Sequence, residues 1–327
     1  MNKSIKILFN YFLGPVLLII LCWSLYRQVI HQADLNQRWQ HIRSSWKDPR
    51  LWTVIFLVFI NWGIEARKWQ LLVAHVQHFT FLRAFKSVLS GCSVTMLTPN
   101  RVGEYGGRIL YVEQGNRIRA ISLTIVGSIS QLLVTMIMGC LGLLILRYFP
   151  HMEPPGLHAL PEFWELVLLY VSAGFTVFLF LFYIRLGWLV RIMERVPAFK
   201  KIITHIGVLD EFSGWSLVRI LSLSFVRYLV FVMQYVLLLQ VMGVEITSWT
   251  CFWLMTMFYL VMAIAPTIGF LELPIRAKAS VEILGMYAIT NTLGIQAATL
   301  GIWLINLVFP ALIGSLLILG IKIVKEK

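Results

Sequence analysis

Long apolar runs alternate with short polar stretches along the chain, and this alternation is the first guide to its structure. An α-helix needs about 20 apolar residues to cross a lipid bilayer. Runs of that length predict six membrane-spanning helices, at residues 11–31, 51–73, 120–147, 163–185, 215–241 and 294–321. Two shorter apolar runs, 84–98 and 249–265, each lead directly into a polar stretch. The pattern therefore predicts an all-α polytopic membrane protein.

The composition supports the same class. The 327 residues are 59% hydrophobic and 13% charged, whereas about a quarter of the residues in soluble domains are charged. We therefore expect a single integral membrane domain over residues 1–327. The net charge of +13 is expected to retain loops in the cytoplasm and to attract anionic lipid head groups. No soluble basic domain is evident, so we expect no nucleic-acid partner.

Basic residues orient the predicted helices, because cytoplasmic loops of membrane proteins are enriched in lysine and arginine. The linker 186–214 and both termini are basic and are predicted to be cytoplasmic, whereas the loop 148–162 has no lysine or arginine and is predicted to be external. Counting spans from that loop makes residues 84–118 and 249–290 re-entrant helical hairpins that enter from opposite faces. We expect an integral protein of a plasma (bacterial inner) membrane.

Two polar stretches share one sequence pattern and divide the chain into two halves, 51–147 and 215–321. They read TPNRVGEYGGR at residues 98–108 and APTIGFLELPIR at residues 265–276, each with a proline, a glycine and Glu-x-x-x-Arg. Inverted repeats of this kind build secondary transporters, whose broken helices meet at a midplane site. Irregular backbone at membrane depth is tolerated where it is buried in protein or lines a wet cavity. The candidate substrate-path residues are Pro99, Asn100, Arg101, Gly103, Glu104, Arg108, Arg227, Pro266, Gly269, Glu272 and Arg276.

The Glu-x-x-x-Arg spacing places both charges on one face of a helix. Two interpretations stay open: the pairs only hold the hairpins in place, or the arginines also bind a phosphate. Arg227 lies inside a predicted span, where it is either functional or extends to the cytoplasmic interface. Other polar residues get simpler roles. We expect Glu65, Arg67 and Lys68 to be interfacial, with a role in the substrate pathway as the alternative. We expect Ser128, Gln131 and Asn306 to bond neighbouring helices, and Lys278 with Glu282 to form a structural pair.

Besides the two polar stretches, the chain has a basic-Trp dipeptide, Lys68-Trp69, at the end of the second predicted span. Together with Thr98-Pro-x-x-x-Gly-Glu and Pro266-x-x-Gly269, it resembles the lysylphosphatidylglycerol synthase transmembrane-region family, which is also described as flippase-like. The resemblance covers nearly the whole chain, although Asn100-Arg101 replaces the small residues common in the family. It implies movement of an anionic or modified lipid between leaflets. We expect no soluble aminoacyl-transfer domain after the last span, and so no synthase activity.

The leading hypothesis is a flippase- or scramblase-like translocator of an anionic or modified phospholipid or an isoprenoid-linked glycan. The chain has no ATP-binding Walker motif, so movement is expected to be downhill or ion-coupled, with Glu104 and Glu272 as candidate proton carriers. One alternative is a lipid-binding membrane subunit that does not transport, with a membrane enzyme or a second copy of the chain as partner. Others are a small-solute transporter and an integral membrane transferase. The sequence lacks HExxH, GxSxG and DxD, and we expect no enzymatic activity, metal or cofactor.

Overall fold

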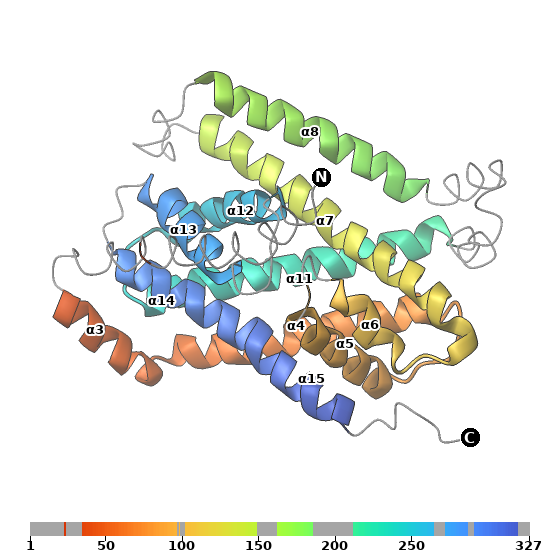
Figure 1. Cartoon of the computed structure of the whole chain (residues 1–327). Coiled ribbons are helices and arrows are strands. Elements are labelled where there is room, and N and C mark those ends of the chain that lie inside the picture. Colours follow the sequence, from red (N-terminus) through yellow and green to blue (C-terminus); the bar gives the residue numbers. More distant parts are fainter. Residues whose placement is uncertain are drawn as a thin grey trace, which may run out of the picture.

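The computed structural model describes residues 35–96, 102–148, 162–185, 212–264, 272–286 and 291–319, together with Trp23 and Thr98. The regular secondary structure of the described residues is helical, with no β-strand among them (Figure 1). The helices are α3 (Leu35–Ser44), α4 (Pro49–Val73), α5 (Phe81–Met96), α6 (Gly103–Ile109), α7 (Arg117–Tyr148), α8 (Glu162–Ile184), α11 (Gly214–Val241), α12 (Ser248–Ile264), α13 (Glu272–Gly285), α14 (Thr292–Trp303) and α15 (Phe309–Leu319). One π-helical turn, Leu304–Val308, joins α14 to α15.

Four described helical segments are long and apolar enough to cross a membrane: Gln114–Tyr148, Leu166–Ile184, Gly214–Val241 and Thr292–Ile318. They confirm four of the predicted spans. The predicted span 51–73 forms α4, which is not among these four because polar side chains such as Asn61, Glu65 and Lys68 lower its hydropathy. The predicted span 11–31 lies outside the described residues except for Trp23. The total number of spans and the re-entrant course of the hairpins therefore stay predictions.

Several helices begin where a short polar side chain can accept a backbone N–H. Asp48 accepts from the N–H of Arg50 at 2.8 Å at the start of α4, where Pro49 fixes the first helical residue. Ser213 accepts from the N–H of Ser216 at 3.2 Å at the start of α11. These caps set the first turns of α4 and α11, the two helices that lie against each other.

Glycines allow α5 and α6 to pack closely in the first predicted hairpin. A Cβ on Gly107 would overlap the backbone of Ser90 and Gly91, and one on Gly103 would overlap the backbone oxygen of Val94. The N–H of Gly103 also donates to the Thr98 hydroxyl at 2.7 Å. The glycines of the motif are therefore needed because the two backbones touch, and this contact fixes where α6 presents Glu104 and Arg108.

The two halves interlock through equivalent contacts. The helix α5 packs on α15, and α12 packs on α7, so the helix of each predicted hairpin lies against the last helix of the other half (Figure 1). Glycines mark both crossings, since a Cβ on Gly139 would overlap Leu260 and one on Gly314 would overlap the backbone of Leu89. This matching arrangement is what an internal repeat predicts. The opposite insertion of the halves in a membrane stays a prediction.

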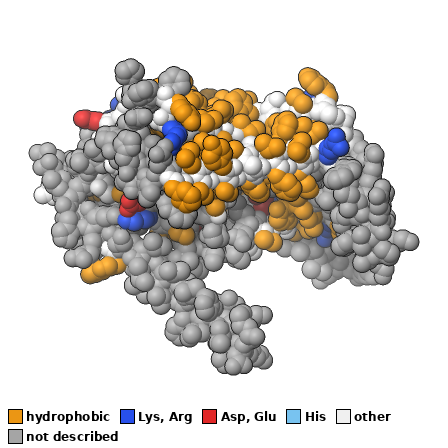
Figure 2. Space-filling view, turned by 90° about the horizontal axis from the view of Figure 1, so that it is seen from above, with side chains coloured by type: hydrophobic (Ala, Val, Ile, Leu, Met, Phe, Trp, Pro, Cys, Tyr) orange, Lys and Arg blue, Asp and Glu red, His pale blue; other side chains and the backbone are white. Residues whose placement is uncertain are grey.

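Many large hydrophobic side chains of the described helices are exposed, as expected for helices that face lipid. The helix α8 leaves many large side chains exposed, including Phe163, Tyr170 and Phe178, and Figure 2 shows hydrophobic side chains spread over the face seen from above. The helix α3 is amphipathic, with Trp39 exposed and Ile42 packed against the core.

Candidate functional site

A buried carboxylate at the centre of the bundle gathers three cationic side chains. Glu65 of α4 lies 2.8 Å from Lys68 Nζ, 2.6 Å from the guanidinium of Arg108 on α6 and 3.2 Å from that of Arg227 on α11. Glu65, Lys68 and Arg108 are only 4%, 1% and 2% exposed. We call these four residues the Glu65 cluster. It joins the first predicted hairpin to the central helices of both halves.

Arg108 bridges two carboxylates. Its Nη2 donates to Glu65 and to Glu104, which lies one turn earlier on α6. The guanidinium also lies over the ring of Trp69, 5.2 Å from the ring centroid. The sequence therefore predicted the Glu104–Arg108 pair correctly, and the structure adds Glu65 as a second partner that no local pattern connects to it.

Hydrogen bonds extend the cluster across several helices. The ammonium of Lys68 donates to the carbonyl of Gly127 on α7 and to the Ser224 hydroxyl on α11, both at 3.4 Å. The guanidinium of Arg227 donates to Asn61 at 2.9 Å and to Gln131 at 3.4 Å. Arg227 is thus held inside the bundle, and the interpretation that it extends to the cytoplasmic interface is wrong.

Other polar residues within the helices also behave as predicted. Asn61 donates to Asn306, in the π-helical turn, at 2.9 Å, and Gln131 donates to the carbonyl of Ser224 at 3.3 Å. Both contacts join helices from different halves, which confirms that Gln131 and Asn306 bond neighbouring helices. Ser128 instead donates to the carbonyl of Thr124 on its own helix at 3.1 Å, and no bond from it to a neighbouring helix is found among the described residues.

The interfacial position expected for Glu65 and Lys68 is wrong. Both side chains are buried in the Glu65 cluster, whereas Arg67 is exposed and donates to Gln70 at 2.6 Å. The sequence does contain a pattern that indicates a shared face: Asn61, Glu65 and Lys68 follow the i, i+4, i+7 spacing of one side of a helix. That polar stripe turns inward because α11 supplies Arg227 and Ser224 opposite it.

The second half contributes a matching pair on α13. The guanidinium of Arg276 lies 2.7 Å from the carboxylate of Glu272, one turn earlier. A second pair on the same helix, Lys278 with Glu282 at 2.5 Å, is far more exposed, with 36% and 59% of the side chains accessible. Burial separates these two pairs, although their spacing along α13 is the same.

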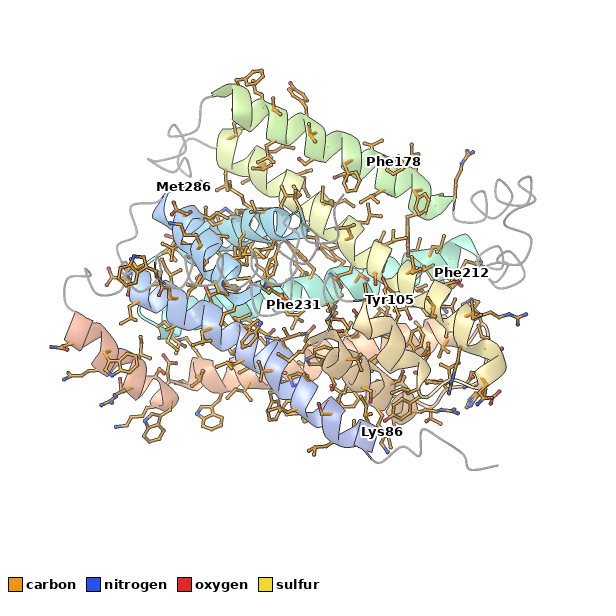
Figure 3. All side chains as sticks on the ribbon, viewed as in Figure 1. Lys86, Tyr105, Phe178, Phe212, Phe231 and Met286 are labelled. Carbon is orange, nitrogen blue, oxygen red and sulfur yellow. The ribbon has the colours of Figure 1, made fainter. Side chains whose placement is uncertain are left out.

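The charged groups of both halves line one cavity of about 490 Å³. Seven charged side chains from α4, α6, α11 and α13 are among its described lining residues: Glu65, Lys68, Glu104, Arg108, Arg227, Glu272 and Arg276. The helix α7 adds Ser128, Gln131 and Thr135. Figure 3 shows Tyr105 and Phe231 in the middle of the molecule and Phe178 on the outer helix α8. Tyr105 also lines the cavity, and the guanidinium of Arg227 lies against the ring of Phe231.

Five of the candidate residues contribute to this cavity, and the others do not or are not described. Gly103 forms the close contact between α5 and α6 and does not line the cavity. The remaining candidates lie outside the described residues: Pro99, Asn100, Arg101, Pro266 and Gly269. Residues that the sequence analysis did not select also line it, above all Glu65, Lys68, Trp62 and Tyr259.

The formal charges that line the cavity do not cancel. Among the described residues, four cationic and three anionic side chains leave a net charge of +1. Uncompensated charge is costly away from water, so an anionic group is the ligand that such a cavity favours. Arginine is suited to phosphate because its planar guanidinium can donate two parallel hydrogen bonds to it.

The comparisons with known proteins agree with this membrane setting. The model of one protein family, described as the lysylphosphatidylglycerol synthase TM region, matches residues 11–314. No curated protein and no solved structure matches the chain.

Proposed function

The chain belongs to the lysylphosphatidylglycerol synthase transmembrane-region family, and we propose that it moves lipid head groups between the leaflets of a membrane. The preferred cargo is an anionic or modified phospholipid, and an isoprenoid-linked glycan is the alternative cargo. The head group passes through the cavity while the acyl chains stay in the surrounding lipid. We place the protein in a plasma membrane with both termini in the cytoplasm.

One observation carries this proposal: Arg108 and Arg276, from corresponding motifs of the two halves, line the same cavity. In transporters built from repeats, the substrate site lies where the two halves meet, and access alternates as one half moves against the other. The contacts of α5 with α15 and of α12 with α7 give each half a surface along which such a movement could occur. The family's lipid association and the exposed hydrophobic side chains of the described helices support a lipid as cargo.

The charge of the cavity supports an anionic head group. Arg108 and Arg276 each already pair with a carboxylate, Glu104 and Glu272 respectively. A phosphate that displaces one of these carboxylates keeps the arginine paired, and the displaced carboxylate avoids an unpaired charge by taking up a proton, which keeps the cost of the exchange low. The same two carboxylates line the cavity and are our candidates for proton coupling, if movement is driven by a pH gradient. The proposed role involves no chemical reaction.

A second candidate function is lipid binding without transport, in which the protein presents a lipid to a membrane enzyme. The density of ion pairs in the Glu65 cluster favours this candidate, since three cations fixed on one buried carboxylate describe a rigid site. A rigid site binds well but changes its access slowly.

Reconstitution separates the two candidates. Purified protein in vesicles would be tested with head-group-labelled phosphatidylglycerol, its aminoacylated form and phosphatidylcholine, with and without a pH gradient. The proposal expects faster movement of the first or second lipid than in protein-free vesicles. Saturable binding of a lipid with no faster movement under any condition would instead support the non-transporting subunit.

A further inference from the structure

Three buried hydrogen-bond donors on residues that line the cavity have no partner among the residues that the structure describes. They are the indole Nε1 of Trp62 on α4, the hydroxyl of Tyr259 on α12 and the Nε of Arg108 on α6. Buried donors are normally paired, because an unpaired donor forfeits the hydrogen bond that it made to water. A cavity with several unpaired donors is therefore suited to a ligand that brings acceptor oxygens.

Packing, rather than hydrogen bonding, holds the first two donors in place. Trp62 is 8% exposed, and the guanidinium of Arg227 lies over its ring, 5.6 Å from the centroid. The ring of Tyr259 makes edge contacts with the rings of Tyr228 and Phe258, at centroid distances of 5.8 and 5.3 Å. Both side chains are thus fixed before any ligand arrives, which lowers the entropy cost of binding.

The charge balance indicates the class of ligand. The described residues that line the cavity carry a net formal charge of +1, and a phosphodiester brings one negative charge and two oxygens that only accept hydrogen bonds. We propose that Trp62 and Tyr259 are ligand-binding residues that donate to the oxygens of a singly charged phosphodiester, while the Glu65 cluster supplies the opposing charge. This inference rests on the proposed function only in taking a lipid head group as the ligand; it does not require transport.

The assignment also predicts which lipids are disfavoured. A zwitterionic phosphocholine head group adds a cation to a cavity that already has one in excess, and its quaternary ammonium offers no acceptor. A phosphatidylglycerol head group keeps its charge of −1 and adds hydroxyls. The cavity should therefore prefer phosphatidylglycerol over phosphatidylcholine at equal chain length.

Binding is tested on the purified full chain in a neutral detergent. Short-chain dihexanoyl phosphatidylglycerol is titrated while thermal unfolding is followed, because a ligand that binds the folded state stabilises it by RT ln(1 + [L]/Kd) and so raises the unfolding temperature. The variants are Trp62→Phe and Tyr259→Phe, which remove the donors and keep aromatic rings. The matched controls are Trp253→Phe and Trp303→Phe, which remove buried indole donors that have no partner among the described residues and do not line the cavity.

We expect each cavity variant to raise the Kd about tenfold, the size of one hydrogen bond to a charged group, and each control to change it less than about twofold. The Kd for dihexanoyl phosphatidylcholine should be higher than for phosphatidylglycerol in the wild type. Unchanged affinity in Trp62→Phe and Tyr259→Phe, equal losses in the controls, or no stabilisation of the wild type by phosphatidylglycerol would each overturn the assignment. If Trp62→Phe fails to fold, Tyr259→Phe decides alone.

Vesicle assays on the same proteins keep this inference separate from the proposed function. A wild type that binds as expected but moves no lipid refutes transport and leaves the donor assignment standing. A wild type that moves lipid, with both cavity variants binding normally, refutes the donor assignment and leaves transport standing.

Discussion

Arg227 of α11 lies 3.2 Å from Glu65 of α4, and this buried ion pair joins the two halves of the chain at the wall of the cavity. Glu65 is also the counter-charge of Lys68 and Arg108. The three cations would repel one another without it, so the carboxylate holds together helices that come from distant parts of the sequence.

Removing this carboxylate should destabilise the fold. Glu65→Gln keeps the shape of the side chain but leaves three buried cations with less compensation, which should lower the free energy of unfolding by about 3 kcal/mol. Glu282→Gln is the control, since its pair with Lys278 is exposed and should contribute less than about 1 kcal/mol. Thermal unfolding in detergent measures both, and equal stability of Glu65→Gln and wild type would show that Glu65 is not the organising charge.

The two ion pairs on α13 should differ in function. Arg276→Ala removes a cation that lines the cavity, whereas Lys278→Ala removes one from an exposed pair on the same helix. We expect Arg276→Ala to slow translocation of labelled phosphatidylglycerol by about tenfold or more, the size of one lost charged contact, and Lys278→Ala to leave it near the wild-type rate. Similar rates in the two variants would place Arg276 in a structural role.

Neighbouring glycines provide a test of the α5–α6 contact. A Cβ on Gly107 would overlap the backbone of Ser90, whereas nothing lies within 4 Å of a Cβ on Gly106. Gly107→Ala should therefore destabilise the protein by about 1–3 kcal/mol, and Gly106→Ala should be neutral or stabilise it by up to about 1 kcal/mol. Unfolding curves of the two variants measure this difference. If Gly107→Ala were as stable as the wild type, α5 and α6 would be able to move apart without cost.

Charge selectivity should depend on Lys68. Lys68→Met keeps an unbranched side chain but brings the net formal charge of the described lining residues from +1 to zero. The preference for anionic over zwitterionic head groups should then be lost, as seen in the ratio of their translocation rates. Lys86→Met removes the same charge from a residue that does not line the cavity, so its ratio should stay that of the wild type. A preserved ratio in Lys68→Met would contradict the charge account.

The membrane class, four of the spans and both Glu-x-x-x-Arg pairs could be predicted from the sequence, because hydropathy and helical spacing are local properties. The role of Glu65 could not. Its partners Arg108 and Arg227 come from other helices, and hydropathy placed Glu65 at the end of a span. Spacing alone also could not separate Glu272–Arg276 from Lys278–Glu282, since both are i, i+4 pairs. Only the packing of α13 shows which pair lines the cavity.

The passage of head groups through the cavity can be tested by blocking it. Thr135→Cys places a thiol on the cavity wall in a chain whose four cysteines, Cys22, Cys92, Cys140 and Cys251, are replaced by serine or alanine. Ser222→Cys, which lies on α11 away from the cavity, is the control. A charged methanethiosulfonate reagent is attached to each thiol, with labelling verified by mass, and translocation of phosphatidylglycerol is measured before and after reduction. We predict that labelling at position 135 stops movement, that reduction restores it, and that labelling at position 222 has little effect. Unchanged movement with position 135 fully labelled would contradict passage through the cavity.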